Sequence, residues 1–216
     1  MTSAHCLTTE FEGFIFLGRT VYCGVANSPI ISGIVDYYHQ FREVKSDRIH
    51  PQYVDYDPAV PFVVSIEYDI ALLQLETPLI FNDFVQPTKL WNGVDRIPEQ
   101  CQSVGFGLAD RADGSLALSP VMREITHTVR TQARCMQFDP RPNLPTLTDN
   151  NICFFTSPGT ELQRQCGGDS GGPALCGGIQ VGITTYSNRP CTVRSYNGNM
   201  NVANFFDWIK ENTFYS

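Results

Sequence analysis

Hydrophobic, β-branched and aromatic residues along this chain gather in short runs, and Gly, Pro, Asn or Asp bounds each run. Such runs are typical of β-strands, because a strand needs apolar residues for its buried face and turn-forming residues at its ends. Many short strands separated by turns favour a β-sandwich or a β-barrel. The pattern predicts strands at Phe14–Leu17, Thr20–Val25, Ile30–Val35, Phe62–Ile66, Ile70–Leu75, Gln102–Phe106, Arg123–Val129, Asn151–Phe155, Pro173–Leu175 and Ile179–Thr185.

The clearest helical pattern lies near the C-terminal end. Phe205, Trp208 and Ile209 are spaced i, i+3 and i+4, so they would share one face of a helix, and Asn204 is a candidate N-cap. We expect this helix to pack against the body of the fold. A weak seam at Asn92–Gln100 separates two strand-rich halves.

Composition narrows the class of protein. Of the 216 residues, 42% are hydrophobic, which is enough to fill a core, and 17 Gly and 14 Pro favour a turn-rich globule over a helical bundle. The net charge of −7 gives no electrostatic attraction to phosphate backbones, so we expect no nucleic-acid partner. The longest apolar runs, such as Ala59–Val64, are far shorter than the roughly 18 to 20 residues of a membrane-spanning helix, so we expect no membrane partner.

The cysteine content and the N-terminal segment point to different compartments. Eight cysteines without CxxC pairs or zinc-type spacing fit a secreted, disulfide-bearing protein, yet the first ten residues lack the basic and apolar regions of a signal peptide. Eight cysteines allow 105 pairings, and composition does not choose among them. They are Cys6, Cys23, Cys101, Cys135, Cys153, Cys166, Cys176 and Cys191.

Three short segments carry residues suited to nucleophilic catalysis. Residues 166–173 read Cys-Gly-Gly-Asp-Ser-Gly-Gly-Pro around Ser170, residues 2–6 read Thr-Ser-Ala-His-Cys around His5, and residues 68–75 begin Tyr-Asp-Ile-Ala around Asp69. A serine hydroxyl is a weak nucleophile, so it needs an imidazole to take its proton and a carboxylate to hold the imidazole in the right tautomer. The sequence therefore predicts Ser170 as the nucleophile, His5 as the base and Asp69 as the orienting carboxylate.

On these segments the chain resembles the trypsin/chymotrypsin family of serine peptidases, since the order His5, Asp69, Ser170 is the chymotrypsin-like order and neither the subtilisin nor the α/β-hydrolase order. The resemblance implies that the N–H groups of Gly168 and Ser170 form the oxyanion hole. It also implies that Asp169 is buried and pairs with the α-amine created when a propeptide is cut off.

The resemblance implies an all-β fold of two antiparallel barrels with a C-terminal helix, covering nearly the whole chain. We expect residues 1–95 to form the N-terminal barrel, and residues 96–216 the C-terminal barrel and the helix. The implied disulfides are Cys101–Cys176, Cys135–Cys153 and Cys166–Cys191, whereas Cys6 and Cys23 remain unpaired or uncertain. No metal and no organic cofactor is implied.

The residues of the implied substrate pocket depart from the family pattern. Arg164 stands six residues before Ser170, at the pocket bottom, where its charge would repel Lys or Arg side chains. Either Arg164 attracts an acidic side chain, or it turns away or pairs with a carboxylate and leaves an apolar or partly blocked pocket. The other expected pocket residues are Thr185, whose hydroxyl could support Asp69, Tyr186, Ser187, and either Asn197 or Gly198.

Two further departures concern the N-terminal half. His5 lies much closer to the start of this chain than the family histidine does, so we expect the recorded sequence to be an incomplete part of a longer secreted proenzyme whose first barrel lacks its initial strands. His5 and Asp69 are 64 residues apart, more than in shorter family members, and we expect the extra residues in a surface loop within Asp36–Val60.

The leading hypothesis is an extracellular serine endopeptidase that forms an acyl-enzyme and does not have trypsin-like specificity. Its partners would be protein or peptide substrates and, as further candidates, protein inhibitors, and it would act as a monomer. The alternative is a non-catalytic homologue that serves as a binding or regulatory module. A third hypothesis is a truncated or decayed product that does not fold.

Overall fold

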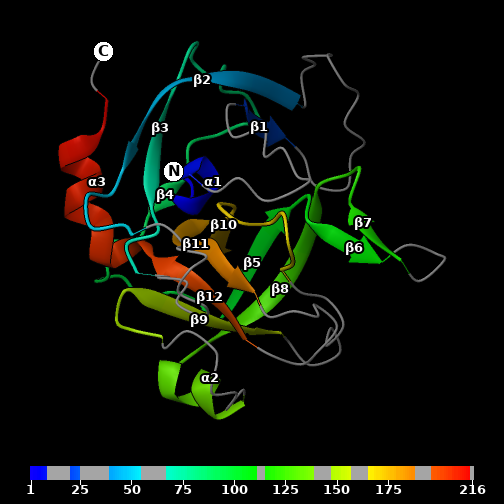
Figure 1. Ribbon diagram of the computed structural model, residues 1–216, viewed down its shortest axis with the longest axis vertical. Helices are drawn as coiled ribbons and strands as arrows, with labels where there is room; N and C mark the ends of the chain where they lie inside the picture. The colour runs from blue at the N-terminus through cyan, green and yellow to red at the C-terminus, as the bar shows by residue number, and fades with distance from the viewer. Residues whose placement is uncertain are drawn as a thin grey trace.

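The structure is a computed structural model that describes residues 1–8, 20–24, 39–54, 67–110, 115–138, 147–156, 165–187 and 196–214. Most of its regular structure is β (Figure 1). The strands are β1 (Thr20–Gly24), β2 (His39–Ile49), β3 (Ala71–Leu75), β4 (Lys89–Leu90), β5 (Gln100–Gly105), β6 (Leu108–Asp110), β7 (Leu116–Leu118), β8 (Arg123–Arg130), β9 (Asn151–Thr156), β10 (Pro173–Cys176), β11 (Ile179–Ser187) and β12 (Tyr196–Asn201). The helices are α1 (His5–Thr8), α2 (Gln132–Phe138), the 3₁₀ turn η1 (Val202–Phe205) and α3 (Phe206–Asn212).

The C-terminal half forms a closed six-stranded antiparallel barrel. Its strands follow the order β5-β8-β9-β12-β11-β10, and β10 pairs back with β5 to close the ring, while β4 adds a short parallel pairing to β11. The N-terminal half contributes the antiparallel sheet β1-β2-β3. This arrangement, with α3 at the C-terminal end, confirms the predicted chymotrypsin-like fold class.

One apolar cluster joins the two halves. Ile70 and Leu72 from the β3 region pack with Ile183 of β11 and with residues from β12, η1 and α3. Ile70 and Ile183 are both 0% exposed, so no water separates the sheet from the barrel at this point. Burying such side chains stabilises the fold by roughly 1.5 to 3 kcal/mol each. The segment that carries Asp69 is therefore anchored in the core immediately after that residue.

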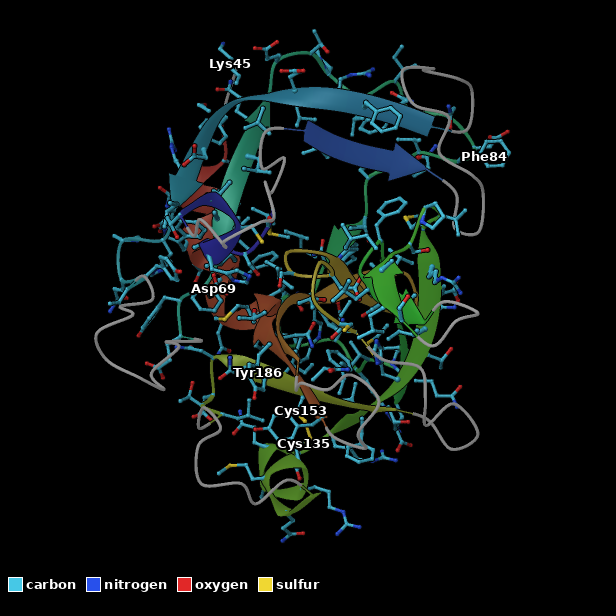
Figure 2. The ribbon with its side chains drawn as sticks, turned by 45° about the vertical axis from the view of Figure 1, so that its right-hand side comes forward. Lys45, Asp69, Phe84, Cys135, Cys153 and Tyr186 are labelled. Atoms are coloured by element: carbon cyan, nitrogen blue, oxygen red, sulfur yellow. A yellow bond between two sulfur atoms is a disulfide. The ribbon has the colours of Figure 1, made fainter. Side chains whose placement is uncertain are left out.

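Two disulfides fix parts of the barrel. Cys101 of β5 is bonded to Cys176 of β10, and Cys135 of α2 is bonded to Cys153 of β9 (Figure 2). These are two of the three pairs that the resemblance implies. Cys166 is also disulfide-bonded, and its implied partner Cys191 lies outside the described residues, as does the side chain of Cys23.

Seven of the ten predicted strands correspond to β1, β3, β5, β8, β9, β10 and β11, and the other three lie outside the described residues. The surface loop expected somewhere within Asp36–Val60 does not lie at His39–Ile49, which is β2, and residues 36–38 and 55–60 of that range lie outside the described residues. Glu43, Lys45 and Asp47 alternate outward along β2, so its charges meet water while Val44 and Ser46 face inward. The sequence reading missed β2 because a strand with one exposed face need not be apolar.

The C-terminal helical segment packs on the core through Phe205, Trp208 and Ile209, as predicted. The predicted cap is wrong: Asn201 accepts a hydrogen bond from Ala203 N–H and caps η1, whereas the Asn204 side chain donates to Asp149 O. The helical turns begin three residues earlier than expected, at Val202 instead of Phe205. Within the described part of the chain, no helix combines the length and apolar character that a membrane crossing requires.

Candidate active site

His5 and Asp69 form a pair that is fixed at two points. His5 Nδ1 lies 2.6 Å from Asp69 Oδ2, and the backbone N–H of His5 donates to Asp69 Oδ1 over 2.8 Å. Asp69 is 2% exposed, and Figure 2 shows it beside the short helix α1. Because both carboxylate oxygens hold the same residue, the ring is oriented with Nδ1 toward Asp69 and Nε2 on the opposite side.

The surroundings of His5 favour its protonated form. Burial alone lowers the pKa of His5, but the hydrogen bonds with Asp69 and Cys6 and the electrostatic interactions with the same two groups outweigh it and raise the pKa to about 10. Cys6 Sγ is 3.7 Å from His5 Nε2, and Cys6 is a free cysteine. The imidazole is thus held between a carboxylate at Nδ1 and a sulfur at Nε2.

The loop of Ser170 lies directly against this helix. Gly171 N–H donates to Thr184 O over 2.7 Å, and Ser3 Oγ donates to the same carbonyl over 2.8 Å. A Cβ placed on Gly171, whose φ is +79°, would come within 2.2 Å of Thr2 Oγ1 and 3.4 Å of Cys6 Sγ. The chain on either side of His5 and the residue after Ser170 are therefore in contact.

Ser170 is half-buried in this loop. Among the described residues, no hydrogen bond joins Ser170 Oγ to His5 Nε2, and the sulfur of Cys6 makes the polar contact at that nitrogen instead. The structure thus brings the predicted nucleophile and base into neighbouring segments without a direct hydrogen bond between them. Apo active sites often show such long or unmade catalytic hydrogen bonds.

Two backbone N–H groups beside Ser170 are available to a ligand. Neither Gly168 N–H nor Ser170 N–H donates to any residue that the structure describes. Gly168 has φ +96°, and a Cβ there would lie 2.9 Å from Leu118 Cδ2 and 3.2 Å from Gly107 Cα. Only glycine combines this backbone conformation with this close approach. The two expected oxyanion donors therefore lie on either side of Asp169 in sequence, and their N–H groups make no hydrogen bond within the described part of the chain.

The Asp169 carboxylate lies on the other side of the loop, against two glycines. Gly107 N–H donates to Oδ1 over 2.7 Å and Cys166 N–H donates to Oδ2 over 2.8 Å. A Cβ on Gly105 would come within 2.1 Å of Oδ1, so the carboxylate fills the space beside that glycine. Burial raises the pKa of Asp169, and the two backbone hydrogen bonds oppose this rise. Its partners in the described structure are amide groups, not the α-amine that the resemblance implies.

The expected pocket residues lie on adjacent strands, with Tyr186 opposite Gly198 and Ser187 opposite Asn197 in the β11–β12 register. The two candidates for the second pocket position are therefore neighbours on β12. The expected support of Asp69 by Thr185 is not made, because Thr185 Oγ1 donates to Ile183 O over 3.1 Å.

Arg164 and its neighbour Gln165 differ in what the structure describes of them. Arg164 lies outside the described residues. Gln165 was not predicted from the sequence. Its side chain is 2% exposed and donates from Nε2 to Ser103 Oγ and to Thr184 Oγ1. Its place directly before Cys166 was the only sequence signal that could have pointed to it.

A closed antiparallel barrel, with a His–Asp pair and a Gly-Asp-Ser-Gly-Gly loop beside it, defines the class of chymotrypsin-like serine proteases. The chain belongs to the trypsin family, because the family model described as Trypsin matches residues 1–209.

Curated relatives and a solved structure agree with this class. The chain is 32% identical over 145 residues to Chymotrypsin-2 of Vespa crabro, a match that covers 67% of this chain and 61% of that protein. It is 29% identical over 218 residues to Trypsin of Phaedon cochleariae, covering 99% and 74% of the two chains. Among solved structures it resembles neuropsin, a serine protease expressed in the limbic system of mouse brain, with a TM-score of 0.65 and 24% identity over 80% of this chain and 72% of that one.

Proposed function

We propose that this chain is a serine endopeptidase in which Ser170 is the nucleophile, His5 the general base and Asp69 the orienting carboxylate. The observation that carries the proposal is the doubly anchored His5–Asp69 pair beside the loop of Ser170. A carboxylate at Nδ1 holds the imidazole in the tautomer and orientation in which Nε2 accepts a serine proton.

The proposed reaction has two halves. Ser170 Oγ attacks the carbonyl carbon of the scissile peptide bond and its proton passes to His5 Nε2, while the free N–H groups of Gly168 and Ser170 hold the oxyanion. The C–N bond breaks, the proton moves from His5 to the leaving nitrogen, and an acyl-enzyme remains on Ser170. Water then attacks the acyl carbon and gives a proton to His5. The bond between the acyl carbon and Ser170 Oγ breaks, the acid leaves, and His5 passes the proton to Oγ, which restores the hydroxyl.

The state of His5 sets a condition on this reaction. With a pKa of about 10, the imidazole carries its proton at neutral pH and cannot act as a base until that proton is lost. The proposed activity is therefore highest at alkaline pH in the arrangement that the structure describes. Loss of the contact between Cys6 and His5 would move the pH of highest activity toward neutral.

We further propose that the enzyme does not cleave after Lys or Arg, because the family resemblance assigns Arg164 to the pocket bottom, where its charge would repel these side chains. Its substrates are proteins or peptides, with protein inhibitors as further partners, and it acts as an extracellular monomer. Residues 1–95 and 96–216 form its two barrel halves.

The second candidate function is that of a non-catalytic binding module. It is favoured by the contact of Cys6 Sγ with His5 Nε2, which occupies the nitrogen that catalysis requires. In that case the free N–H groups of Gly168 and Ser170 would bind a partner without chemistry.

Labelling with aryl phosphonate esters separates the two candidates. We expect one equivalent of label on Ser170 with acidic or apolar recognition groups and none with a basic group, with a rate that rises between pH 7 and 10. Ser170→Ala should abolish the label, and the exposed serine variant Ser115→Ala should retain it. If the folded wild-type chain takes no label anywhere in this pH range, the non-catalytic candidate stands.

A further inference from the structure

The residue before Asp69 has a backbone conformation that its side chain disfavours. Tyr68 has φ +58°, and it is the only non-glycine residue with positive φ in the described part of the chain. This left-handed conformation is energetically unfavourable for an ordinary L-residue, and a bulky residue seldom adopts it. Such conformations persist where the surrounding structure imposes them, and they gather at functional sites.

The conformation of Tyr68 places Asp69 at the centre of a tight turn. Ile70 N–H donates to Tyr68 O over 2.7 Å, which closes a three-residue turn around Asp69, and Ile70 O accepts from His50 N–H over 3.0 Å. Ile70 itself is fully buried in the cluster between the sheet and the barrel. The core and the His50 hydrogen bond thus fix Ile70, on the C-terminal side of the turn. On the N-terminal side, the direction of the chain is set by the backbone conformation of Tyr68.

The Tyr68 ring is held by an aromatic group from two distant parts of the chain. It stacks on the His50 ring with centroids 5.0 Å apart and planes 20° apart, and it meets Phe205 edge-on at 6.0 Å. His50 in turn contacts Trp208 of α3, with ring centroids 4.8 Å apart. Aromatic pairs of this geometry stabilise a fold beyond the area that they bury, and this gain opposes the backbone cost at Tyr68.

His50 is suited to this stacking role. It is 7% exposed, and its Nδ1 accepts a hydrogen bond from Gln52 N–H over 3.2 Å, so Nδ1 carries no proton. A neutral imidazole presents a flat face to the Tyr68 ring. Its backbone N–H holds Ile70 at the same time, so one residue contacts both ends of the turn around Asp69.

We propose that Tyr68 and His50 are positioning residues: their stacked rings hold the left-handed turn that aims the Asp69 carboxylate at His5. The turn fixes the direction of the Asp69 side chain, and that direction places Oδ2 at 2.6 Å from Nδ1 and Oδ1 at 2.8 Å from the His5 N–H. A role of Tyr68 and His50 in catalysis rests on the proposed function. Their effect on the geometry of the His5–Asp69 pair does not.

The test follows the Nδ1 proton of His5 in the NMR spectrum of the full chain. Tyr68→Gly permits the left-handed turn but removes the ring, and Tyr68→Phe keeps the ring and is the matched control. We expect the Nδ1 proton of Tyr68→Gly to exchange with water at least tenfold faster than in the wild type and to move upfield. Tyr68→Phe should resemble the wild type.

His50→Ala and His50→Phe provide a second pair that leaves Tyr68 unchanged. The proposal is supported if the His5 Nδ1 proton exchanges faster in His50→Ala and at the wild-type rate in His50→Phe. Unchanged Nδ1 exchange in folded Tyr68→Gly and His50→Ala overturns it, even if both melt at lower temperature, because that is the result of a purely structural role. If the wild type takes no phosphonate label, the proposed function fails, but the exchange of the Nδ1 proton still decides whether the two rings position Asp69.

Discussion

The sulfur of Cys6 lies 3.7 Å from His5 Nε2, on the side of the imidazole opposite Asp69. The ring therefore has a hydrogen-bonding neighbour at each nitrogen, and both neighbours raise the pKa of His5 against the effect of burial. In a serine protease mechanism Nε2 must be free to accept the serine proton. The contact with Cys6 thus adds to the effect of Asp69 in raising the pKa of His5.

Replacing Cys6 by Ala should lower the pKa of His5, because the hydrogen bond and the electrostatic interaction at Nε2 are lost while Asp69 remains. Each unit of decrease raises the fraction of neutral imidazole at pH 7 about tenfold. Titration of the His5 ring protons by NMR measures the change, and the phosphonate labelling rate at Ser170 should shift to lower pH in parallel. An unchanged titration in Cys6→Ala would mean that Asp69 alone sets the pKa of His5.

The His5–Asp69 pair should make the chain less stable at alkaline pH. The folded-state pKa of His5, about 10, is above the ordinary 6.5, so its contribution to stability is fully present below pH 6.5 and is lost as the pH rises toward 10. The slope reaches at most about 1.4 kcal/mol per pH unit. Urea unfolding from pH 6.5 to 10 measures it, and Asp69→Asn should give a markedly flatter curve than the wild type. The same variant should slow labelling of Ser170 by roughly 10⁴-fold at its pH optimum, as expected for loss of an orienting carboxylate.

How much of the site could be predicted from sequence depends on whether a residue acts through a motif or through packing. His5, Asp69 and Ser170 stand in short segments of specific sequence, so their neighbourhood was predictable. The contact of Cys6 with Nε2 was not, because it depends on the direction of two side chains in the one-turn helix α1. The stacking of Tyr68 on His50 was equally hidden, since it joins residues that no sequence periodicity connects.

The fold shows the same division. Five barrel strands, β5, β8, β9, β10 and β11, were predicted from their residue pattern. The sixth, β12, was missed because its sequence is mostly polar although it is buried, and β2 was missed because Glu43, Lys45 and Asp47 face water. The expected cap Asn204 was wrong since a 3₁₀ turn precedes α3 and places Asn201 at its start.

His127 of β8 should make the barrel sensitive to acid. It is 0% exposed, packs against Phe154 with ring centroids 5.5 Å apart, and neither ring nitrogen has a hydrogen-bond partner in the described structure. Burial lowers the pKa of His127 to about 4, so its neutral form is favoured in the folded state and stability falls as the pH drops from 6.5 through 4. The loss by pH 4 is on the order of 3 kcal/mol.

Unfolding curves of the wild type and His127→Leu at pH 7 and pH 4.5 test this prediction. The difference in unfolding free energy between the two pH values should be smaller in the variant, because Leu does not titrate. If His127→Leu does not fold, the ring-proton titration of His127 in the wild type gives the same answer. A midpoint near 6.5 would contradict the prediction.

Gly171, in the loop of Ser170, lies against the segment around His5. Replacing Gly171 by Ala should push the two segments apart. A Cβ would come within 2.2 Å of Thr2 Oγ1 and 3.2 Å of Ser3 N, and φ is +79°. Gly178 is a matched control, because it has the same φ of +79° and a Cβ there would meet nothing within 4 Å. Gly178→Ala measures the backbone cost alone, roughly 1 to 2 kcal/mol.

We expect Gly171→Ala to lower the unfolding free energy by a further 1 to 3 kcal/mol, a cost of about the size that overpacking produces. It should also slow phosphonate labelling of Ser170 by at least tenfold, since about 1.4 kcal/mol of lost alignment in the transition state has that effect. Gly178→Ala should label at the wild-type rate because this residue lies in the turn between β10 and β11, outside the serine loop. Equal unfolding free energies and equal labelling rates for the two variants would show that the loop of Ser170 does not depend on its contact with Thr2 and Ser3.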